Sequence, residues 1–515
     1  MDVREIFSST TSAAATDGLS SSRHMTCTRK LRTALIHSKP LGLSLIVVAL
    51  LGAGMLVLRA QGSIPAQNPR VITNFGPESF VSRVVTTDLA GPWEVTWGPD
   101  GFLWITERVG KRITRVNPVD GSKKVAVTID EVYQTLAQDG LLGMALHPDL
   151  LKGKDSDYVY VAYTYDADFG SGVKLRMKIR RYTYEPQTQH LSRPVDVLTN
   201  LPHGTDHGGG RVVFGPDRKL YVSRGDQGSN FLANYCNRNR AQDLPTQAQV
   251  DASDWSSYQG KILRLNLDGS IPRDNPTLNG VRSHIYSYGH RNPQGLVFAG
   301  TRLFESEHGE SIDDEVNLVV AGGNYGWPLI AGYQDDQSYM YANWSASSPE
   351  PCASLKFDVF NPPASVPRLK EADAHVGNFK PPVKTFFTVP NTYDLRTLGN
   401  ATVAPAGMKV YTSAAIPGWH DSLLLTTMIS GVIFRMPLAG NPKAQIPDPQ
   451  SQVGAPVAYF KTGNRYRDIV VAPDGVRIFV VTDPDGRTVG SSGALVRDLV
   501  NPGAVLEFRY TRNGT

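Results

Sequence analysis

The chain is poor in cysteine, in helical periodicity and in nucleotide-binding motifs. It has three cysteines among 515 residues, so a disulfide-dense scaffold is excluded. No Cys/His spacing typical of zinc, no Walker loop, no Gly-x-Ser-x-Gly and no Gly-x-Gly-x-x-Gly after a strand occurs. These absences argue against a zinc site, a P-loop nucleotidase, an α/β-hydrolase and a nicotinamide-dependent dehydrogenase.

The body of the chain also lacks an excess of either charge. The formal net charge of +4 arises in residues 1–60, which hold seven Lys and Arg against three Asp and Glu. The remaining residues contain 45 of each sign. A neutral body argues against a large basic surface for nucleic acid, so we expect no nucleic-acid partner.

One long apolar run lies near the N-terminus. Residues 41–58 are uncharged and follow a basic segment, with Arg29, Lys30, Arg32 and Lys39 before the run. We expect residues 1–40 to be a disordered basic N-terminus and residues 41–60 a signal peptide or an N-terminal membrane anchor. Either reading predicts export to the periplasm or the extracellular space, and the sequence leaves open whether the leader is cleaved.

The body contains a repeated turn followed by an alternating strand. Gly-Pro-Asp or Ala-Pro-Asp turns open such segments at residues 97–107, 214–224 and 471–481, and degenerate copies occur at 147–163, 298–304 and 418–425. Six copies of one β unit predict an all-β six-bladed propeller with long inserted loops over residues 70–515. A decorated β-sandwich is the alternative, but it does not require a repeat.

Some irregular regions interrupt the repeat. Residues 334–402 are rich in Pro, Ser and Asp and form the largest expected insertion. Residues 129–136 are the segment that we expect to form a short helix. Cys236 and Cys352 pair in one reading and remain separate thiols in the other, because sequence does not give their distance.

Three polar clusters end or begin strands far apart in the sequence. They are residues 205–211 with His207, residues 283–295 with Arg291 and Asn292, and residues 464–468 with Arg465 and Arg467. Loops of a propeller converge at its central channel, so these side chains are expected to meet. A histidine suits a general base, and arginines suit carboxylates that they can grip with two hydrogen bonds. A structural loop histidine and a solvated strand edge are the alternatives.

An acidic segment provides a further candidate site. Residues 307–315 carry several carboxylates around a glycine, and turns at 324–327 and 331–336 follow. Carboxylates and turn carbonyls are the ligands that calcium prefers. The spacing does not fit an EF-hand, so chemistry alone makes calcium a candidate.

Five segments, at residues 140–143, 263–272, 289–295, 322–328 and 464–468, resemble the soluble quinoprotein glucose dehydrogenases and their aldose or sorbosone-type relatives. The similarity runs from about residue 86 to about residue 510. Proteins of this family are six-bladed propellers that bind pyrroloquinoline quinone (PQQ) and Ca²⁺. The resemblance implies PQQ-dependent oxidation of aldose sugars such as glucose at C1 to the lactone, with electrons passed to a quinone or other acceptor.

The resemblance also implies catalytic and substrate-binding roles. His207 would take the proton of the C1 hydroxyl, with Asp226 orienting it. Arg291 would lie beside the quinone carbonyls and polarise them as hydride arrives. Gln138 and Asp206 would line the sugar site.

Cofactor and metal ligands follow from the same resemblance. Asn292, Arg465 and Arg467 would bind the cofactor together with Arg291, and the carbonyls of Gly309 and Glu310 would bind its Ca²⁺. The residues that resemble ligands of further structural calcium ions are Glu315, Tyr325, Ala331, Tyr333 and Asp335. The equivalent region of the family lies at a dimer contact, so a homodimer is one expected arrangement.

Two departures from the family pattern bear on function. Ile429 stands where the glucose enzymes have a cofactor-binding lysine, for which Lys409 or Arg224 would have to compensate. The aromatic substrate loop of those enzymes is missing around residues 393–400. The alternatives to a glucose-type enzyme are therefore a dehydrogenase for sorbosone-like or oligomeric sugars and a non-catalytic carbohydrate- or protein-binding propeller.

Overall fold

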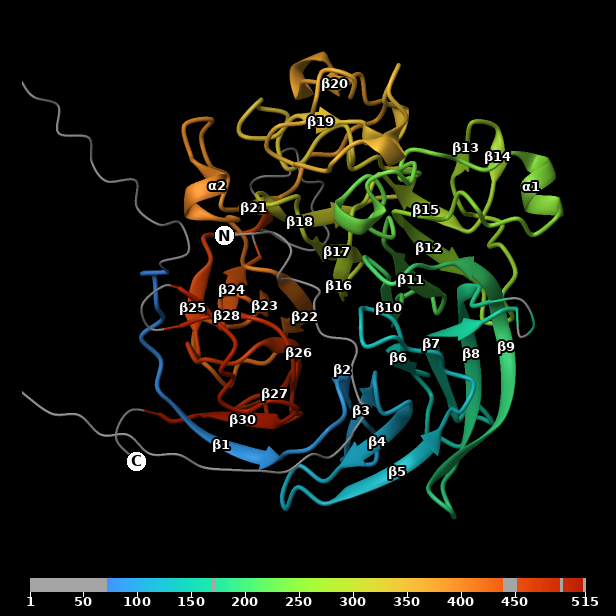
Figure 1. Ribbon diagram of the computed structural model, residues 1–515. Coiled ribbons are helices and arrows are strands. Elements are labelled where there is room, and N and C mark those ends of the chain that lie inside the picture. The colour runs from blue at the N-terminus through green and yellow to red at the C-terminus, as the bar shows by residue number, and fades with distance from the viewer. Residues whose placement is uncertain (1–71, 169, 171, 439–451, 491–493, 513–515) are drawn as a thin grey trace, which may run out of the picture. The chain divides into compact units, whose positions relative to one another are not determined.

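Six four-stranded antiparallel sheets form the body of the protein. The computed structural model describes residues 72–512 apart from 169, 171, 439–451 and 491–493, so the leader predictions for residues 1–40 and 41–60 lie outside the described residues. Each sheet is one blade, and the innermost strands β2, β6, β10, β16, β22 and β26 surround the centre (Figure 1). The predicted all-β six-bladed propeller is confirmed.

The first three blades follow one another along the chain. Blade one consists of β2 (Pro92–Trp97), β3 (Leu103–Glu107), β4 (Arg112–Val116) and β5 (Lys123–Thr128). Blade two consists of β6 (Leu141–Leu146), β7 (Tyr158–Asp166), β8 (Leu175–Glu185) and β9 (His190–Pro202). Blade three consists of β10 (Gly209–Phe214), β11 (Leu220–Arg224), β12 (Lys261–Leu265) and β15 (Ile285–Tyr288).

The last blade closes the ring with a strand from the start of the body. Blade four consists of β16 (Pro293–Ala299), β17 (Arg302–Glu307), β18 (Asp314–Val319) and β21 (Lys384–Phe386). Blade five consists of β22 (Pro405–Tyr411), β23 (Ser422–Thr427), β24 (Ile433–Pro437) and β25 (Val457–Tyr459). Blade six consists of β26 (Tyr466–Val471), β27 (Arg477–Thr482), β30 (Val505–Tyr510) and β1 (Phe80–Thr86). Figure 1 shows β1 in blue along β30 in red, a pairing that joins the two ends of the body.

The repeated Pro-Asp turns connect the first and second strands of the blades. In the three clearest copies, an oxygen of Asp100, Asp217 or Asp474 accepts the backbone N–H two residues later, at 3.1, 3.2 and 3.0 Å. This local hydrogen bond is why aspartate favours such turns. All six repeated segments fall at the junction between the first two strands of a blade, so each copy of the repeat marks one blade.

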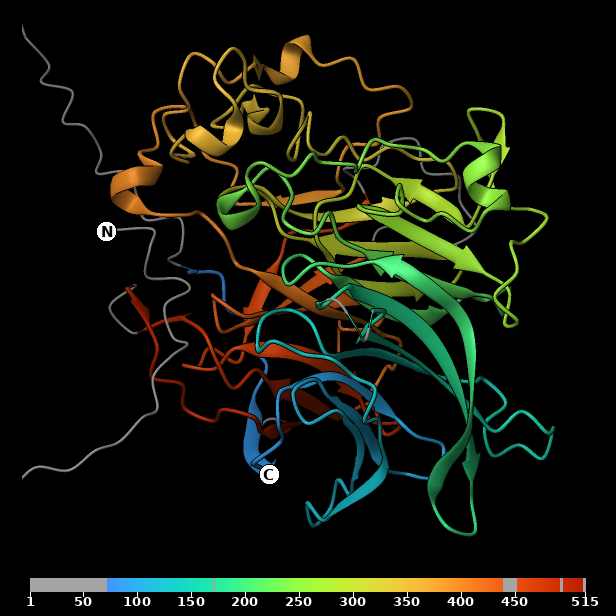
Figure 2. The ribbon, with the colours of Figure 1, turned by 45° about the vertical axis from the view of Figure 1, so that its right-hand side comes forward.

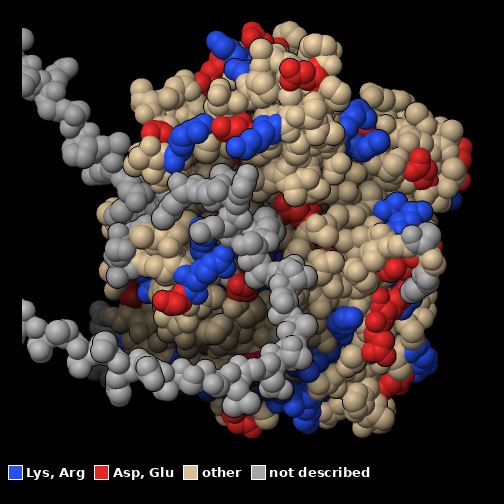
Figure 3. Space-filling model, viewed as in Figure 1, with Lys and Arg blue, Asp and Glu red and all other residues tan. Residues whose placement is uncertain are grey.

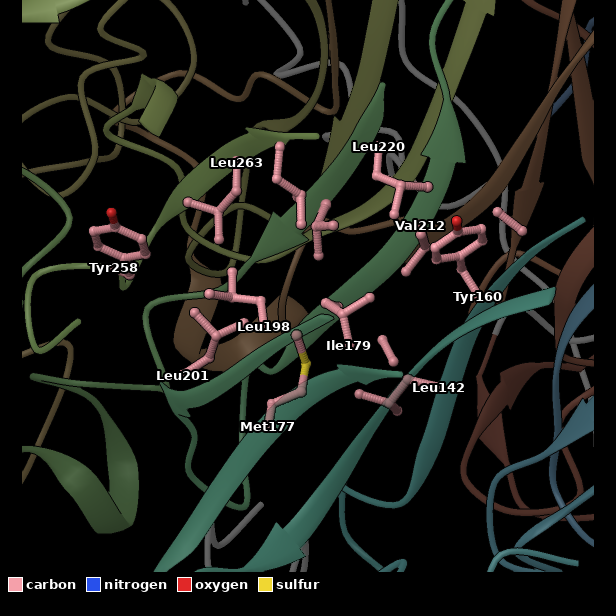
Figure 4. Packing of buried hydrophobic residues seen from close by; sticks show 14 of the residues in the cluster. Leu142, Tyr160, Met177, Ile179, Leu198, Leu201, Val212, Leu220, Tyr258 and Leu263 are labelled. Atoms are coloured by element: carbon pink, nitrogen blue, oxygen red, sulfur yellow. The ribbon is translucent and has the colours of Figure 1, made fainter. Parts of the chain in front are cut away.

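The hydrophobic core lies between adjacent blades. The cluster in Figure 4 contains Leu142 and Met177 from blade two and Val212, Leu220 and Leu263 from blade three, whose side chains point toward one another. All five are fully or almost fully buried. Packing of this kind fixes the angle between blades, and with it the positions of the loops that enter the central region.

Insertions project beyond the blades. Residues 225–260 contain the 3₁₀ turn η2 (Leu232–Asn234) and helix α1 (Gln247–Asp251), and the hairpin β13 (Thr277–Leu278) and β14 (Val281–Arg282) follows β12. Residues 320–383 contain β19 (Tyr341–Ala342), β20 (Arg368–Leu369) and the 3₁₀ turns η3 (Trp344–Ala346), η4 (Cys352–Ser354) and η5 (Glu371–Asp373), and helix α2 (Leu395–Leu398) lies between blades four and five. A last hairpin pairs β28 (Thr488–Val489) with β29 (Leu495–Val496). Figure 2 shows the gold and orange insertion as a separate layer over the sheets.

Two open points of the sequence are resolved. Cys236 and Cys352 form a disulfide that links the insertion of blade three to that of blade four.

The prediction of a helix at residues 129–136 is wrong, because the segment is an irregular loop. Its backbone bonds to other parts of the fold instead, since Tyr133 N donates to Thr164 O at 2.9 Å. Among the described residues, no helix has the length and apolar character needed to cross a membrane.

Candidate functional site

The three polar clusters lie where innermost strands begin. His207 precedes β10, Arg291 and Asn292 precede β16, and Arg465 precedes β26. Gln138 lies in the loop before β6, so blades two, three, four and six each contribute a residue. Because the innermost strands of a propeller begin at the same end of its central channel, residues far apart in the sequence meet there.

His207 and Asp226 form a buried hydrogen-bonded pair. His207 Nδ1 lies 2.7 Å from Asp226 Oδ1, and both side chains are almost completely buried. His207 has a φ of 42°, a left-handed conformation that is uncommon outside glycine. Gly225 permits it, because a Cβ at that position would lie 1.9 Å from the His207 carbonyl oxygen. The local sequence is therefore built around the position of this histidine.

The surroundings of Asp226 keep its carboxylate ionised. Oδ1 also accepts the Gly228 N–H at 2.9 Å, and Oδ2 accepts from Trp327 Nε1 at 2.7 Å and Asn239 Nδ2 at 2.9 Å. Burial raises the pKa of Asp226, but His207, Arg291 and Trp327 outweigh it and hold the pKa below its usual value. An ionised carboxylate only accepts hydrogen bonds, so His207 donates through Nδ1–H, and in the neutral form of the imidazole the acceptor is Nε2.

The predicted sugar-binding residues lie beside this pair. Gln138 Nε2 donates to Asp206 Oδ1 at 2.5 Å, and Asp206 Oδ1 also accepts the His207 backbone N–H at 2.9 Å. Asp206 Oδ1 is 3.8 Å from His207 Nε2. Asn292 Nδ2 lies 3.5 Å from Gln138 Oε1. Gln138, Asp206, His207 and Asn292 are therefore brought together as the convergence of loops predicts.

Arg291 lies against two aromatic rings with unused hydrogen-bonding capacity. Its Cζ is 5.2 Å from the centre of the Trp327 ring and 5.4 Å from that of Phe231. Nη1 reaches the His308 carbonyl oxygen at 3.4 Å, whereas the buried Nε has no hydrogen-bond partner among the described residues. A buried, cationic donor without a partner fits an anionic or carbonyl-bearing ligand.

Arg465 and Arg467 belong to a larger basic cluster. Arg467 donates to Asp483 and to Gln294 Oε1, the latter at 3.2 Å, and Arg465 Nη1 donates to the Arg487 carbonyl at 2.5 Å. The buried Nε of Arg465 has no hydrogen-bond partner in the described part of the chain. Asp483 is buried, and Arg467, Arg465 and Arg108 together hold its pKa far below its usual value. Asp485 also lies near Arg465 and Arg108, and Asp139 lies near Arg108. Guanidinium groups gathered in this way suit a ligand with carboxylates, which each can bind with two hydrogen bonds.

Arg108 is a member of this cluster that the sequence did not reveal. Its side chain is buried, and its Nη1 donates to the carbonyls of Ala137 and Asp139, the latter at 3.1 Å. These carbonyls flank Gln138, so Arg108 links the basic cluster to the predicted sugar-binding loop. Burial is the main cause of the lowered pKa of Arg108. Arg108 directly follows the buried strand β3 and belongs to no polar motif, so nothing in the sequence indicated its role.

Lys409 and Arg224 are the residues expected to compensate for the lysine that Ile429 replaces, and both have other surroundings. Arg224 is buried, and its two terminal nitrogens donate to the carbonyls of Pro202 and Gly208 and to the Met177 sulfur. Lys409 lines a cavity of about 740 Å³ together with Glu94 and the turn residues that end the innermost strands. That cavity lies toward the opposite end of the strands from His207. Arg108, which lies with Arg467 and Asp483, is instead the additional cation on the side of the candidate site.

The acidic segment gathers carboxylates that repel one another. Burial is the main cause that raises the pKa of Asp313 to about 8, and the carboxylates of Glu315, Asp335 and Glu371 add to it. Glu371, from the distant turn η5, accepts the N–H of Ala331 at 2.9 Å. Such a group suits a cation with oxygen ligands. Glu371 could not be found from sequence, because the irregular insertion gives no register.

The other predicted calcium residues lie in the segments on either side of β18. Gly309 and Glu310 lie in the loop between β17 and β18, where Gly309 N donates to Asp314 Oδ1 at 3.1 Å. Tyr325 is buried and donates to the Leu318 carbonyl at 2.7 Å. The carbonyl of Tyr333 accepts the Asp335 N–H at 2.9 Å. Their roles as metal ligands stay predictions.

The surface charges agree with the neutral composition. On the face shown in Figure 3, Lys and Arg side chains are interspersed with Asp and Glu side chains, and tan residues separate the small groups.

Comparisons of the sequence with known proteins identify its relatives. The sequence profile of the glucose/sorbosone dehydrogenase family matches residues 89–355 and 382–497. Quinoprotein glucose dehydrogenase B of Acinetobacter calcoaceticus is 42% identical over 478 residues, which cover 90% of this chain and 98% of that protein. An aldose sugar dehydrogenase of Escherichia coli is 26% identical over 433 residues, which cover 82% of this chain and 93% of that protein.

A solved structure extends the likeness to three dimensions. The PQQ-bound aldose sugar dehydrogenase of Streptomyces coelicolor superposes with a TM-score of 0.56 at 26% identity, covering 84% of this chain and 99% of that one. The family profile covers most of the chain and the Acinetobacter protein is similar over nearly its whole length. The chain therefore belongs to the glucose/sorbosone dehydrogenase family.

Proposed function

We propose that this protein is an exported, PQQ-dependent dehydrogenase that oxidises aldose sugars at C1 to the lactone. The observation that carries the proposal is the buried His207–Asp226 pair, which lies beside Gln138, Asp206 and Arg291. The names of its relatives support the same class of reaction, since they are quinoprotein glucose and aldose sugar dehydrogenases.

In this proposal, His207 Nε2 accepts the proton of the sugar C1 hydroxyl. Asp226 holds Nδ1–H by a 2.7 Å hydrogen bond and stabilises the imidazolium that forms. Asp206 and Gln138 orient the sugar hydroxyls, because their side chains lie next to Nε2 and offer both acceptors and donors. The burial of the pair excludes water from the transferred proton.

The basic residues suit the cofactor. Arg465, Arg467 and Arg108 provide positive charge for carboxylates, and the unpartnered Nε atoms of Arg291 and Arg465 fit acceptor oxygens. When bound, PQQ supplies the two-electron acceptor for the hydride from the sugar C1. The carbonyls of Gly309 and Glu310 would hold its Ca²⁺, and the group around Asp313 would hold structural calcium that supports a homodimer.

Reconstitution tests the proposal. Purified protein stripped of cofactor should gain dye-linked oxidation of glucose or another common aldose when PQQ and Ca²⁺ are added together. A His207→Ala variant reconstituted in the same way is the control for dye reduction without the general base. If PQQ binds without turnover of any aldose, the aldose assignment is rejected.

A non-catalytic binding propeller is the second candidate, because Ile429 replaces a lysine of the glucose enzymes. Titration of PQQ in the presence and absence of Ca²⁺, followed by protein fluorescence, separates the two. A binding module would show no saturable calcium-dependent change. A dehydrogenase for sorbosone-like or oligomeric sugars would bind the cofactor and oxidise glucose only weakly.

A further inference from the structure

A second acidic group lies inside blade four and shares Glu315 with the predicted calcium residues. Glu305 and Glu307 alternate on β17, and Glu315 and Asn317 alternate on β18. The strand register places Glu305 opposite Asn317 and Glu307 opposite Glu315. Glu305 and Asn317 are completely buried, and Glu307 is 2% exposed. Carboxylates directly opposite each other in a sheet repel, so this arrangement needs a compensating positive charge.

The hydrogen bonds within the group leave some of its buried polar atoms without a partner. Asn317 Nδ2 lies 3.0 Å from Glu305 Oε2, 3.3 Å from Glu307 Oε1 and 2.9 Å from Glu315 Oε2. An amide nitrogen has two hydrogens, so it cannot donate fully to three carboxylates. Glu305 Oε1 and Asn317 Oδ1 are buried and have no hydrogen-bond partner among the described residues. Two fully buried oxygens of the group are therefore available as ligands.

His290 adds a nitrogen to the same site. Its Nε2 lies 2.9 Å from Ser287 Oγ, and its Nδ1 lies 3.3 Å from Glu307 Oε1 and 3.9 Å from Glu305 Oε2. The imidazole stacks on Tyr325 with 4.5 Å between ring centres, which holds the ring in place. One ligand atom from each of His290, Glu305 and Glu307 lies within 4.8 Å of the others. Bonds of about 2.0–2.4 Å to a central ion would span such separations.

Neither Lys261 nor the guanidinium of Arg291 forms a hydrogen bond with these carboxylates. Lys261 is buried nearby, but its Nζ donates to the carbonyls of Arg240, Ala241 and Gln259 at 3.1, 2.8 and 2.6 Å. Arg291 forms its hydrogen bond through the backbone N–H, which donates to Glu307 Oε2 at 2.5 Å, and the charge of its guanidinium lowers the pKa of Glu307 less than burial raises it. Buried carboxylates this close together require either protons or a metal ion.

We propose that His290, Glu305, Glu307 and Asn317 form a binding site for a divalent cation. Imidazole ligands suit transition metals, and carboxylate and amide oxygens suit harder ions, so Mn²⁺ matches the mixed ligand set better than Ca²⁺ does. The four proposed ligands are not among the residues expected to hold calcium, although Asn317 contacts Glu315 and His290 contacts Tyr325 from that set. The site does not depend on the proposed sugar oxidation. A bound ion would also fix Glu307, whose Oε2 accepts the N–H groups of Arg291 at 2.5 Å and Asn292 at 3.2 Å.

Metal counting tests the site. Full-length protein is stripped with chelator, saturated with Ca²⁺ to fill oxygen-only sites, and titrated with Mn²⁺ while free and bound ion are followed by electron paramagnetic resonance and elemental analysis. The unmodified protein should bind about one equivalent of Mn²⁺ per chain that Ca²⁺ in excess does not displace. Glu305→Gln keeps the side-chain shape and should lose this equivalent.

Controls separate the site from general effects on folding. His290→Ala removes the nitrogen ligand and should also lose the Mn²⁺, which provides a second test if Glu305→Gln does not fold. Glu94→Gln alters a buried carboxylate of blade one, which bonds to Arg211 at 2.5 Å, and should bind as much Mn²⁺ as the unmodified protein. Equal Mn²⁺ uptake by the unmodified protein and by folded Glu305→Gln or His290→Ala would overturn the proposal, and the carboxylates would then be neutralised by protons.

Discussion

Replacing Asp226 by asparagine tests the core of the functional reasoning. Two oxygens of Asp226 accept four hydrogen bonds, two on Oδ1 from His207 and Gly228 and two on Oδ2 from Trp327 and Asn239. Asparagine has one oxygen and one NH₂ group, so two of the four donors would face another donor. The variant changes no carbon skeleton, so the effect reports hydrogen bonding and charge alone.

The expected magnitude follows from those contacts. A buried donor left without an acceptor costs about 1–3 kcal/mol, so two of them should lower the free energy of unfolding by about 2–6 kcal/mol. If the NH₂ group faces His207, Nδ1 must become the acceptor and Nε2 the donor. His207 could then no longer take a proton at Nε2, and turnover should fall by about 10²–10⁴-fold, the usual contribution of a general base.

The assay combines denaturation with reconstituted turnover. Urea unfolding of Asp226→Asn gives the loss of stability, and dye-linked sugar oxidation after addition of PQQ and Ca²⁺ gives the loss of rate. Asp120→Asn, in an exposed turn, is the matched control and should change neither quantity by much. Full turnover by a folded Asp226→Asn protein would refute the assignment of His207 as a base oriented by Asp226.

Four further predictions follow from other contacts. His207→Ala should keep PQQ binding, measured by titration, but lose about 10²–10⁴ in turnover, and normal turnover would make His207 a structural loop residue. Chelation of Ca²⁺ should lower the melting temperature, because an ion that binds only the folded state stabilises it, and gel filtration in both buffers shows whether a dimer depends on calcium. Replacing Cys236 and Cys352 by serine should lower the free energy of unfolding by about 2–4 kcal/mol relative to the unmodified protein with its disulfide intact. Under reducing conditions, the variant and the unmodified protein should have the same free energy of unfolding. Asp483 has a depressed pKa in the folded state, so its stabilising charge is present above the unfolded pKa of about 4 and is lost as pH falls further. Asp483→Asn should therefore destabilise the protein strongly at pH 7 and progressively less below pH 4, and an equal effect at both pH values would contradict the ion pairing.

Local chemistry was enough to predict the blades. In the three clearest copies the Asp accepts a hydrogen bond from the backbone two residues later. The strands that follow are short and buried on both faces, because each sheet packs between neighbouring blades. Both signals act over a few residues, so they are visible in the sequence. The same local logic failed at residues 129–136, where Ile129 and Val132 suggest one turn of helix but pack into the core beside β7 as an irregular loop.

The position of the candidate site was predictable only in part. Polar residues at strand ends pointed to His207, Arg291, Asn292, Arg465 and Arg467, and the propeller topology explained why such loops meet. Which atoms meet depends on long-range packing, as in the 2.7 Å contact of His207 with Asp226 and the contact of Asp226 with Trp327, 101 residues away.

The sequence by itself determined the repeat, the turns, the neutral body and the family. Only the tertiary structure decided that Cys236 pairs with Cys352, that Arg108 joins the basic cluster and that Glu305 and Glu307 share a buried face with His290. The physical reason is the range of the interactions. Turn hydrogen bonds and strand alternation are encoded within about ten residues, whereas contacts between blades and insertions depend on how six separate sheets pack around one centre.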